Sequence, residues 1–352
     1  MPFEKFQEEE LPTGKIGEMN KAFRENLFLF GKVKNKVAFV NEEVITPLEL
    51  KEGEQSPLGL FAEASLPEKF QKELPPDKQR LEVRPEHRRS ALLERIIFED
   101  KQGRPYRDID LKGIGYIIGG EIKKPGEIYL GTSREGLLDS DMAFYDYQLS
   151  EEFLRAGIRT NRVLAIIDLE ELIVEEKKIS LEEARKRHII NKKFQPVIEV
   201  RAFATKARIS EIPYSKLDRG WEIKNDAIKL VSQELGRGDK PLSDKEYLEW
   251  FAKTLGQNVG LLHKNGWYHD YLNPHNITLD CRIVDLDGVT ELSNEYNQLT
   301  DLHNAQDSLR TIMKRLGFIL QFDFFNDQFL KSYNAVFPPE EREKYFSRKK
   351  EG

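Results

Sequence analysis

The residues best suited to bind a metal ion gather in one run, from Trp267 to Val289. Asn276 ends a polar loop, and Asp285 follows nine residues later, after two short apolar segments (277–279 and 282–284) joined by a turn. A tight hairpin made from these segments would bring Asn276 and Asp285 side by side. Amide and carboxylate oxygens are ligands for Mg²⁺ in nucleotide sites, together with phosphate oxygens and water. The run therefore predicts that ATP binds here with Mg²⁺, or with Mn²⁺ in its place.

The order of these features, a long helix, a polar loop with an asparagine, a hairpin and an aspartate, is typical of the magnesium site of protein kinases. In kinases the loop reads His-Arg-Asp-Leu-x-x-x-Asn, and its aspartate accepts the proton of the substrate hydroxyl. Tyr271 takes that position here, one residue after Asp270. A phenol with a pKa of about 10 is a poor base at neutral pH, so the kinase route is disfavoured. A surface loop that binds metal only by accident is the alternative explanation.

The loop resembles that of the selenoprotein O (SelO) family, pseudokinase-related enzymes that transfer AMP from ATP to protein hydroxyl groups. Family members carry the loop His-Gly-x-x-Asn-Thr-Asp-Asn, followed by a short hairpin and a metal-binding aspartate. His269, Asn273 and Asn276 stand at matching positions, and Asp285 keeps the family's separation from the asparagine. The resemblance implies that Asn276 and Asp285 are metal ligands. It also implies an α+β, protein-kinase-like, two-lobed fold with a β-rich N-lobe and a mainly helical C-lobe.

Further matches lie upstream, in the family's order, and the resemblance as a whole extends from residue 91 to residue 290. A Leu-Lys-Gly-x-Gly strand implies that Lys112 and Gly113 contact the nucleotide, and a helix motif implies that Glu151 pairs with this lysine. The family's glycine-rich nucleotide loops are altered, because residues 87–90 and 125–127 depart from its Gly-Asp-Gly-Arg pattern. The phosphate cradle is therefore expected to be rebuilt in this chain.

Two arginines and a histidine complete the resemblance. Arg201 and Arg208, seven residues apart, match the pair that grips the terminal phosphates in the family. The family's proton acceptor precedes the metal-binding asparagine, and His275 takes its place here. A neutral imidazole can accept a proton near pH 7, so His275 is the first candidate base and Asp270 the second. The resemblance implies a nucleotide reversed relative to that in kinases, with its α-phosphate accessible to the acceptor.

Apolar spacing predicts the elements that must position these residues. In chain order these are strands in 91–100 and 106–120 joined by a turn at 101–105, a short strand in 126–131, a helix in 142–157, a strand in 162–172, a helix in 180–188 with a capping box from Ser180 to Glu183, a strand from 196 and a helix in 245–266. Proline and glycine in residues 50–90 predict a surface connection. We expect an N-terminal extension or arm (1–90) packed on the body, a β-rich lobe (91–200) and a helical lobe (201–352). Nothing in the pattern of residues 1–90 decides whether they complete the β-rich lobe or cover the cleft.

Composition narrows the class of protein. The chain has 352 residues, with 55 basic and 61 acidic side chains and a net charge of −6. This mild acidity does not favour a nucleic-acid partner, and no apolar run reaches the ~18 residues of a membrane span. The N-terminal segment lacks an apolar signal core. Cys281 is the only cysteine, which excludes an internal disulfide. We therefore expect a cytoplasmic protein with no membrane partner.

The predicted activity is the transfer of AMP from ATP to Ser, Thr or Tyr hydroxyls of a protein substrate, with release of pyrophosphate. Two rivals are left open. One is a kinase-like phosphotransferase, acting on a small molecule with Asp270 as the base or on a protein. The other is a pseudokinase that binds nucleotide without turnover.

Overall fold

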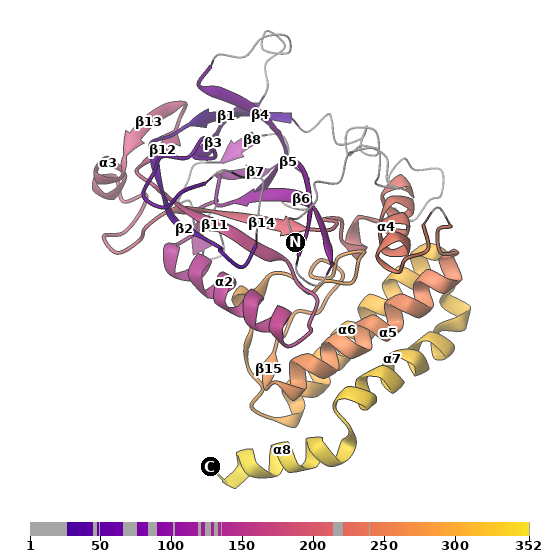
Figure 1. Cartoon of the computed structure of the whole chain (residues 1–352). Coiled ribbons are helices and arrows are strands. Elements are labelled where there is room, and N and C mark those ends of the chain that lie inside the picture. The colour runs from indigo at the N-terminus through magenta and orange to yellow at the C-terminus, as the bar shows by residue number, and fades with distance from the viewer. Residues whose placement is uncertain are drawn as a thin grey trace. The chain divides into compact units, whose positions relative to one another are not determined.

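The computed structural model describes most of the chain (Figure 1). The described residues are 27–44, 48, 50–65, 76–83, 90–100, 103–118, 121–123, 128–129, 133–134, 136–213, 221–238 and 240–351. They fall into two compact units. The first, called the β unit, comprises Asn20–Tyr147 and Arg162–Phe203, and the second, the helical unit, comprises Gln148–Asn161 and Ala204–Gly352. The altered glycine loops at 87–89 and 125–127 lie outside the described residues.

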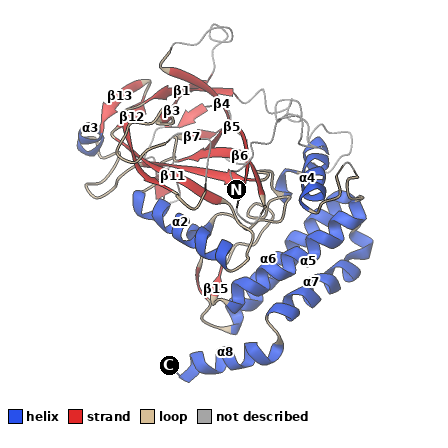
Figure 2. Ribbon diagram, in the orientation of Figure 1, coloured by secondary structure: helices blue, strands red, loops and turns tan. Residues whose placement is uncertain are grey.

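The β unit is built on an eight-stranded sheet (Figures 1 and 2), with the strand order β2-β11-β14-β6-β5-β4-β1-β3. Every neighbouring pair is antiparallel. The strands are β1 (Leu27–Lys32), β2 (Asn35–Val40), β3 (Leu60–Ser65), β4 (Lys78–Glu82), β5 (Ser90–Glu99), β6 (Pro105–Lys112), β11 (Arg162–Leu169) and β14 (Val197–Phe203).

The described part of the N-terminal region belongs to the β unit. Residues 27–82 supply four of the eight strands, and β1 lies between β3 and β4 in the sheet. The described part of residues 1–90 therefore completes the sheet of the β unit, and residue 90 is not a boundary. Proline and glycine between short segments correctly indicate turns. They carry no information on strand pairing, because pairing depends on partners far away in the chain.

Most predicted elements of the β unit are confirmed. Strands β5 and β6 form the expected hairpin, in which the Asp100 carboxylate accepts a hydrogen bond from the Arg104 amide at 3.0 Å. Ser180 caps the next short helix by accepting from the Glu183 amide at 3.2 Å. The strand predicted in 162–172 is interrupted, since β11 ends at Leu169. The remaining elements are β7 (Tyr116–Ile118), β8 (Glu121–Lys123), β9 (Ile128–Tyr129), β10 (Ser133–Arg134), β12 (Glu171–Val174), β13 (Lys177–Ser180) and α3 (Leu181–Lys186).

Helix α2 (Ser140–Arg155) begins in the β unit and ends in the helical unit. In the β unit its first half contributes Ala143, Phe144 and Tyr147 to an apolar cluster with Ile166 of β11 and Val197 of β14. All eight residues of β6 and all seven of β14 are buried. Charged side chains on these two strands therefore need partners within the unit, because an unpaired charge removed from water is costly.

The helical unit contains the long helix α5 (Asp244–Lys264), close to the predicted 245–266. A capping box between Ser243 and Glu246 starts it. Gly256 allows α7 to approach, because a Cβ there would lie 2.1 Å from the Phe329 carbonyl oxygen. The other elements are η3 (Ile209–Glu211), α4 (Trp221–Glu234), β15 (Trp267–Tyr268), η4 (Leu286–Gly288), β16 (Thr290–Glu291), α6 (Glu295–Leu316), η5 (Ile319–Gln321), α7 (Phe322–Val336) and α8 (Pro339–Glu351).

The expected α+β class, β-rich in its first part and mainly helical in its second, is confirmed (Figure 2). None of the helices in the described ranges combines the length and the apolar character that a bilayer span requires.

Candidate functional site

The candidate residues fall into two groups, one in each unit. The helical unit holds Glu151, Arg208, Asp270, His275, Asn276 and Asp285, and the β unit holds Lys112, Gly113 and Arg201. Each group is described within its own unit.

The predicted hairpin is present in the helical unit. Ile277 and Ile283 form an antiparallel bridge, and the Val284 amide donates to the Asn276 carbonyl oxygen at 3.0 Å. Asn276 and Asp285 therefore stand at the open end of the hairpin, on its two strands. This backbone pairing supplies the side-by-side placement that a shared metal ion requires.

The two candidate ligands are held in defined conformations. The Asn276 amide nitrogen donates to the Tyr271 carbonyl oxygen at 3.0 Å, so its amide oxygen points the other way. Asp285 has a left-handed backbone, with φ of 68° and ψ of 60°, immediately before η4 (Leu286–Gly288). Aspartate is one of the few non-glycine residue types that adopt this conformation readily. The left-handed backbone fixes the direction in which the Asp285 side chain leaves the hairpin.

Helix α6 anchors the polar loop. The Asp301 carboxylate is fully buried and accepts from the His269 amide and from the Asp270 amide, each at 2.9 Å. Asn304, one turn later, donates to the Asp270 carbonyl oxygen at 2.6 Å. His269 in turn contacts the Val284 carbonyl oxygen through Nε2 at 3.1 Å, which joins the loop to the hairpin. The sequence interpretation missed Asp301. The pattern that could have indicated it is the helical spacing of residues 295–316, which follow the hairpin by about ten residues.

A buried network extends from Asp301 to α7. His263 contacts Asp301 through Nε2 at 3.2 Å and the Tyr333 hydroxyl through Nδ1 at 2.9 Å. Gln298 donates to the same hydroxyl at 2.6 Å. One proton arrangement satisfies every atom: Gln298 donates to Tyr333, Tyr333 donates to Nδ1, and Nε2–H donates to the carboxylate. His263 is thus a positioning residue that links Tyr333 of α7 to Asp301 of α6.

The second candidate base is engaged within the loop. The Tyr268 hydroxyl donates a short hydrogen bond to the Asp270 carboxylate. Burial and this carboxylate raise the pKa of Tyr268 well above its ordinary value, so the phenol keeps its proton. Tyr271, at the position of the kinase aspartate, is 57% exposed. The contacts of Asp270 indicate a positioning role, and its role as a base stays a prediction.

His275, the first candidate base, is exposed at the turn of the loop. Its amide donates to the Asn273 side chain at 2.9 Å, and its carbonyl oxygen accepts from Arg208. Partial burial, assisted by the Arg208 guanidinium, lowers the pKa of the His275 imidazole below its ordinary value. The ring is therefore neutral at pH 7, as a base must be. The structure places Arg208 beside His275; its contact with phosphate stays a prediction.

In the β unit, Lys112 and Arg201 belong to a buried cluster of charges. Lys112 on β6 lies opposite Glu199 on β14, and Asp110 lies opposite Arg201. The Arg201 guanidinium donates two hydrogen bonds to Asp110, both 2.9 Å long. The Lys112 ammonium donates to Asp146 of α2 at 3.0 Å. Lys112 and Arg201, two of the three cations that were predicted to bind phosphate, are thus held by carboxylates of their own unit.

Asp146 and Glu199 were not singled out from the sequence. Asp146 lies on the predicted helix, five residues before Glu151, which was expected to pair with Lys112. Glu151 is 4% exposed and belongs to the helical unit, so its pairing with Lys112 stays a prediction. A sheet register was needed to find Glu199, because only the register places it opposite Lys112.

Gly113 has a packing reason that is independent of any ligand. Its φ is +94°, and a Cβ there would lie 2.3 Å from the Val197 carbonyl oxygen. Gly103 also has a positive φ, of +75°, but nothing lies within 4 Å of its Cβ position. We expect Gly113→Ala to lower the free energy of unfolding by about 1–3 kcal/mol more than Gly103→Ala does, because of the clash. The midpoint of thermal unfolding, measured for both variants, should therefore fall further in Gly113→Ala. Equal shifts of the two variants would contradict this assignment.

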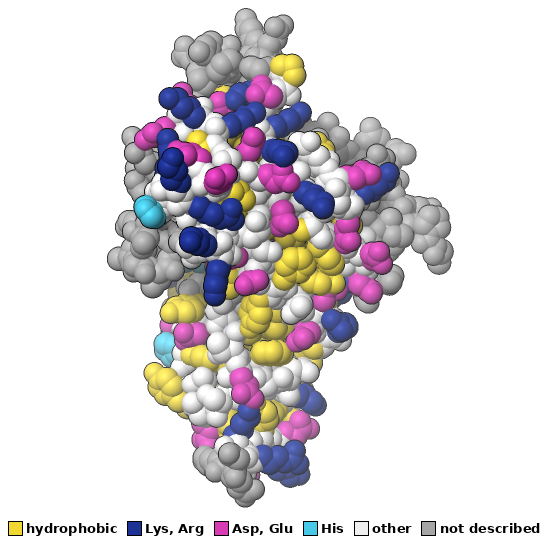
Figure 3. All heavy atoms as spheres, turned by 90° about the vertical axis from the view of Figure 1, so that its left-hand side faces the viewer, with side chains coloured by type: hydrophobic (Ala, Val, Ile, Leu, Met, Phe, Trp, Pro, Cys, Tyr) yellow, Lys and Arg dark blue, Asp and Glu magenta, His cyan; other side chains and the backbone are white. Residues whose placement is uncertain are grey.

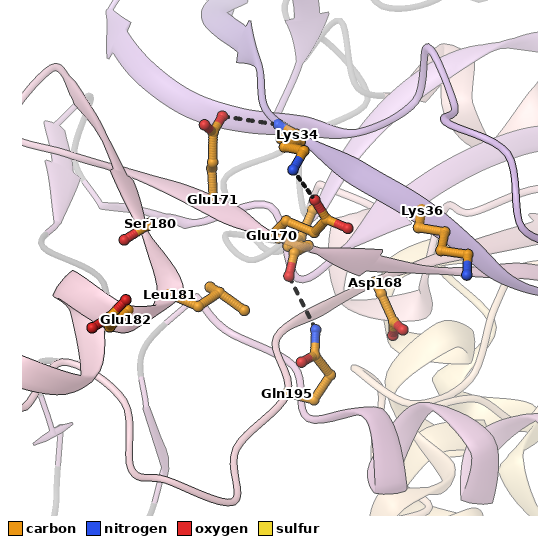
Figure 4. A pocket seen from close by; sticks show the side chains of 10 residues that line it. Lys34, Lys36, Asp168, Glu170, Glu171, Ser180, Leu181, Glu182 and Gln195 are labelled. Carbon is orange, nitrogen blue, oxygen red and sulfur yellow. Dashed lines mark hydrogen bonds and ion pairs between the residues drawn. The ribbon is translucent and has the colours of Figure 1, made fainter.

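A separate pocket of about 460 Å³ lies in the β unit, beside β2, β12 and α3 (Figure 4). Its charges largely satisfy one another. The Lys34 ammonium pairs with Glu170 at 2.8 Å, and the Lys34 amide donates to Glu171 at 3.0 Å. None of the candidate residues lines it. On the face drawn in Figure 3, basic and acidic side chains are interspersed without a large field of one sign.

Comparisons with known proteins give only distant likenesses. No protein-family model and no curated protein matches the chain. A Toxoplasma gondii rhoptry antigen kinase domain aligns at 9% identity and a TM-score of 0.34, over 79% of this chain and 83% of that chain. ROP2 from Toxoplasma gondii, a virulence factor with a protein-kinase fold and no enzymatic activity, aligns at 7% identity and 0.34, over 72% and 78%. WaaP, solved with acyl carrier protein, aligns at 11% identity and 0.24, over 69% and 86%. Alignments this loose carry no argument about the activity of this chain.

Proposed function

We propose that this protein is a kinase-like transferase that binds a magnesium–nucleotide and transfers AMP to hydroxyl groups of protein side chains. The observation that carries the proposal is the hairpin that pairs Val284 with Asn276 and presents Asp285 in a left-handed conformation directly after it. The anchoring of the same loop by Asp301 adds support, because a site that must hold charged groups in place needs a rigid base.

The donor set fits magnesium. Asn276 and Asp285 offer an amide oxygen and a carboxylate, and Mg²⁺ is commonly bound by one or two protein groups together with phosphates and water. No group of three or more His, Cys, Asp or Glu side chains within the described ranges forms a fuller metal site. Bound there, the ion would neutralise charge on the phosphates. The proposal therefore concerns a site that needs both metal and nucleotide.

His275 supplies the base in this proposal. An imidazole nitrogen accepts the proton of the acceptor hydroxyl as the hydroxyl oxygen bonds to the α-phosphorus. The bond from the α-phosphorus to its bridging oxygen breaks, and pyrophosphate leaves with that oxygen. The lowered pKa of His275 supports this role, and the engagement of Asp270 by Tyr268 disfavours the competing base.

The proposed base predicts a pH dependence. Neutral imidazole is the active form, so the transfer rate should rise with pH and be half-maximal below the ordinary histidine pKa of about 6.5. The His275→Ala variant should transfer AMP roughly 10²–10⁴-fold more slowly. Its rate should also no longer fall at acidic pH as the wild-type rate does. Initial rates between pH 5 and 8 measure both effects. An unchanged profile in the variant would remove His275 from the mechanism.

A specific observation favours a second candidate, nucleotide binding without turnover. Lys112 and Arg201 are held by Asp146 and Asp110, so a phosphate must compete with carboxylates for both cations. Incubation with Mg²⁺ and ATP labelled separately at the α- and γ-phosphates distinguishes the candidates, with mass spectrometry of the protein. Protein label from the α-phosphate alone supports AMP transfer, and label from the γ-phosphate alone indicates a phosphotransferase. Thermal stabilisation without any product indicates a pseudokinase.

A further inference from the structure

Glu199 is a buried carboxyl group in the β unit that makes no hydrogen bond. It is fully buried, and neither of its oxygens has a hydrogen-bond partner. Its Oε2 lies 3.9 Å from the Lys112 ammonium and 3.9 Å from Nε of Arg201, both beyond hydrogen-bond length. These cations already donate to Asp146 and Asp110. Glu199 is therefore a third acid beside two cations that are each committed elsewhere.

The balance of charge around Glu199 favours its neutral form. The charged groups facing it are Lys112 and Asp110 on β6, Arg201 on its own strand, and Asp146 on α2, while its partner position on β11 is the apolar Ile166. Two cations and two other carboxylates cancel, so an ionised Glu199 would leave one net negative charge in a buried place. Burial first, and Asp146 second, raise the pKa of Glu199 to about 8.

The carboxylate of Asp146 uses only one of its two oxygens to hold Lys112. Asp146 accepts from Lys112 through Oδ2, whereas its Oδ1 is buried without a hydrogen-bond partner. Asp146 therefore holds the ammonium through one of its two oxygens, and one hydrogen bond is broken when another anion takes its place. An anionic phosphate could therefore displace Asp146, provided that no second negative charge repels it.

We propose that Glu199 is a positioning residue for Lys112 whose bound proton decides whether the lysine can take an anionic phosphate. With a proton on Glu199, the charge of Lys112 is available to a phosphate that replaces Asp146. Without it, the Glu199 carboxylate repels the phosphate and competes for the lysine. Binding of a polyphosphate is then linked to uptake of a proton from solvent by a Glu199 oxygen. This inference rests on the proposed nucleotide-binding function and adds a regulation of it.

The first arm of the test needs no ligand. The pKa of Glu199 is raised on folding, so the folded protein holds a proton that the unfolded chain loses, and stability falls as the pH rises from about 4.5 to about 8. Glu199→Gln removes this loss. Its unfolding midpoint should exceed that of the wild type by a margin that grows between pH 5 and pH 8 and is constant above. Glu42→Gln, an exposed site in the same unit, is the control. Parallel curves for wild type and Glu199→Gln would overturn the proposal.

The second arm measures proton linkage by calorimetry with Mg²⁺–ATP and with tripolyphosphate, in two buffers of different ionisation enthalpy. At pH 8 the wild type should take up as much as about half a proton per ligand, since half of its Glu199 is ionised there. The uptake should vanish at pH 6 and in Glu199→Gln. Binding with equal proton counts in both proteins would overturn the inference and leave the proposed function standing. Absence of binding by the wild type would overturn both.

Discussion

Asp285→Asn should reduce nucleotide-dependent label transfer by a factor on the order of 100 or more. The variant removes the charge of the proposed metal ligand, and a bound metal supplies several kcal/mol of charge stabilisation at about 1.4 kcal/mol for each factor of ten. Asparagine is the right replacement because it tolerates the left-handed conformation that Asp285 adopts. Alanine would add backbone strain to the loss of a ligand, and the two effects could not be separated.

Two measurements check this result. Transfer of label reports the activity, and the shift of the unfolding midpoint caused by Mg²⁺–ATP reports binding. Both should be lost in Asp285→Asn, while the midpoint without ligand should change little. Asp327→Asn, an exposed aspartate on α7, is the control and should behave as the wild type. A variant that keeps the magnesium-dependent shift would show that Asp285 is not a metal ligand.

Asp301→Ala should be the most destabilising substitution near the loop. The buried carboxylate accepts from two loop amides and from His263, so its removal leaves three buried donors without an acceptor. Each unsatisfied buried group costs about 1–3 kcal/mol. We expect a loss of about 3–5 kcal/mol in the free energy of unfolding, measured by urea denaturation, together with faster amide exchange at His269 and Asp270.

The control for this variant is on the same helix. Asp307 is exposed and pairs with Arg310, so Asp307→Ala should cost no more than about 1 kcal/mol. A loss in Asp301→Ala as small as that of the control would mean that the loop does not depend on α6. Slow exchange at His269 in a destabilised Asp301→Ala would place the effect elsewhere in the helical unit.

Local patterns in the sequence were sufficient where the interaction itself is local. The hairpin between Asn276 and Asp285 was predicted from two apolar segments and a turn, and the structure confirms it. The cap at Ser180 and the helix up to Lys264 were likewise readable, because capping and helical periodicity act within a few residues. The role of residues 1–90 was left open for the opposite reason, since the partners of β1 and β2 are distant in the chain.

The candidate site shows the same division. Residue types and spacing were enough to propose Asn276 and Asp285 as metal ligands, and the resemblance to the SelO family led to His275 as the base. Spacing could not show that Asp301 holds the loop. It also could not show that Asp146 and Glu199 lie beside Lys112.

The amino-acid sequence by itself determined the α+β class, the hairpin with its two oxygen donors, and the chemistry that such donors favour. Only the tertiary structure decided that Lys112 and Arg201 are committed to buried carboxylates and that Glu199 lies beside them without a hydrogen bond. The physical reason is that the electrostatic state of a buried group depends on which strands and helices surround it. Sheet register and helix packing set those neighbours, and both join residues that are tens of positions apart.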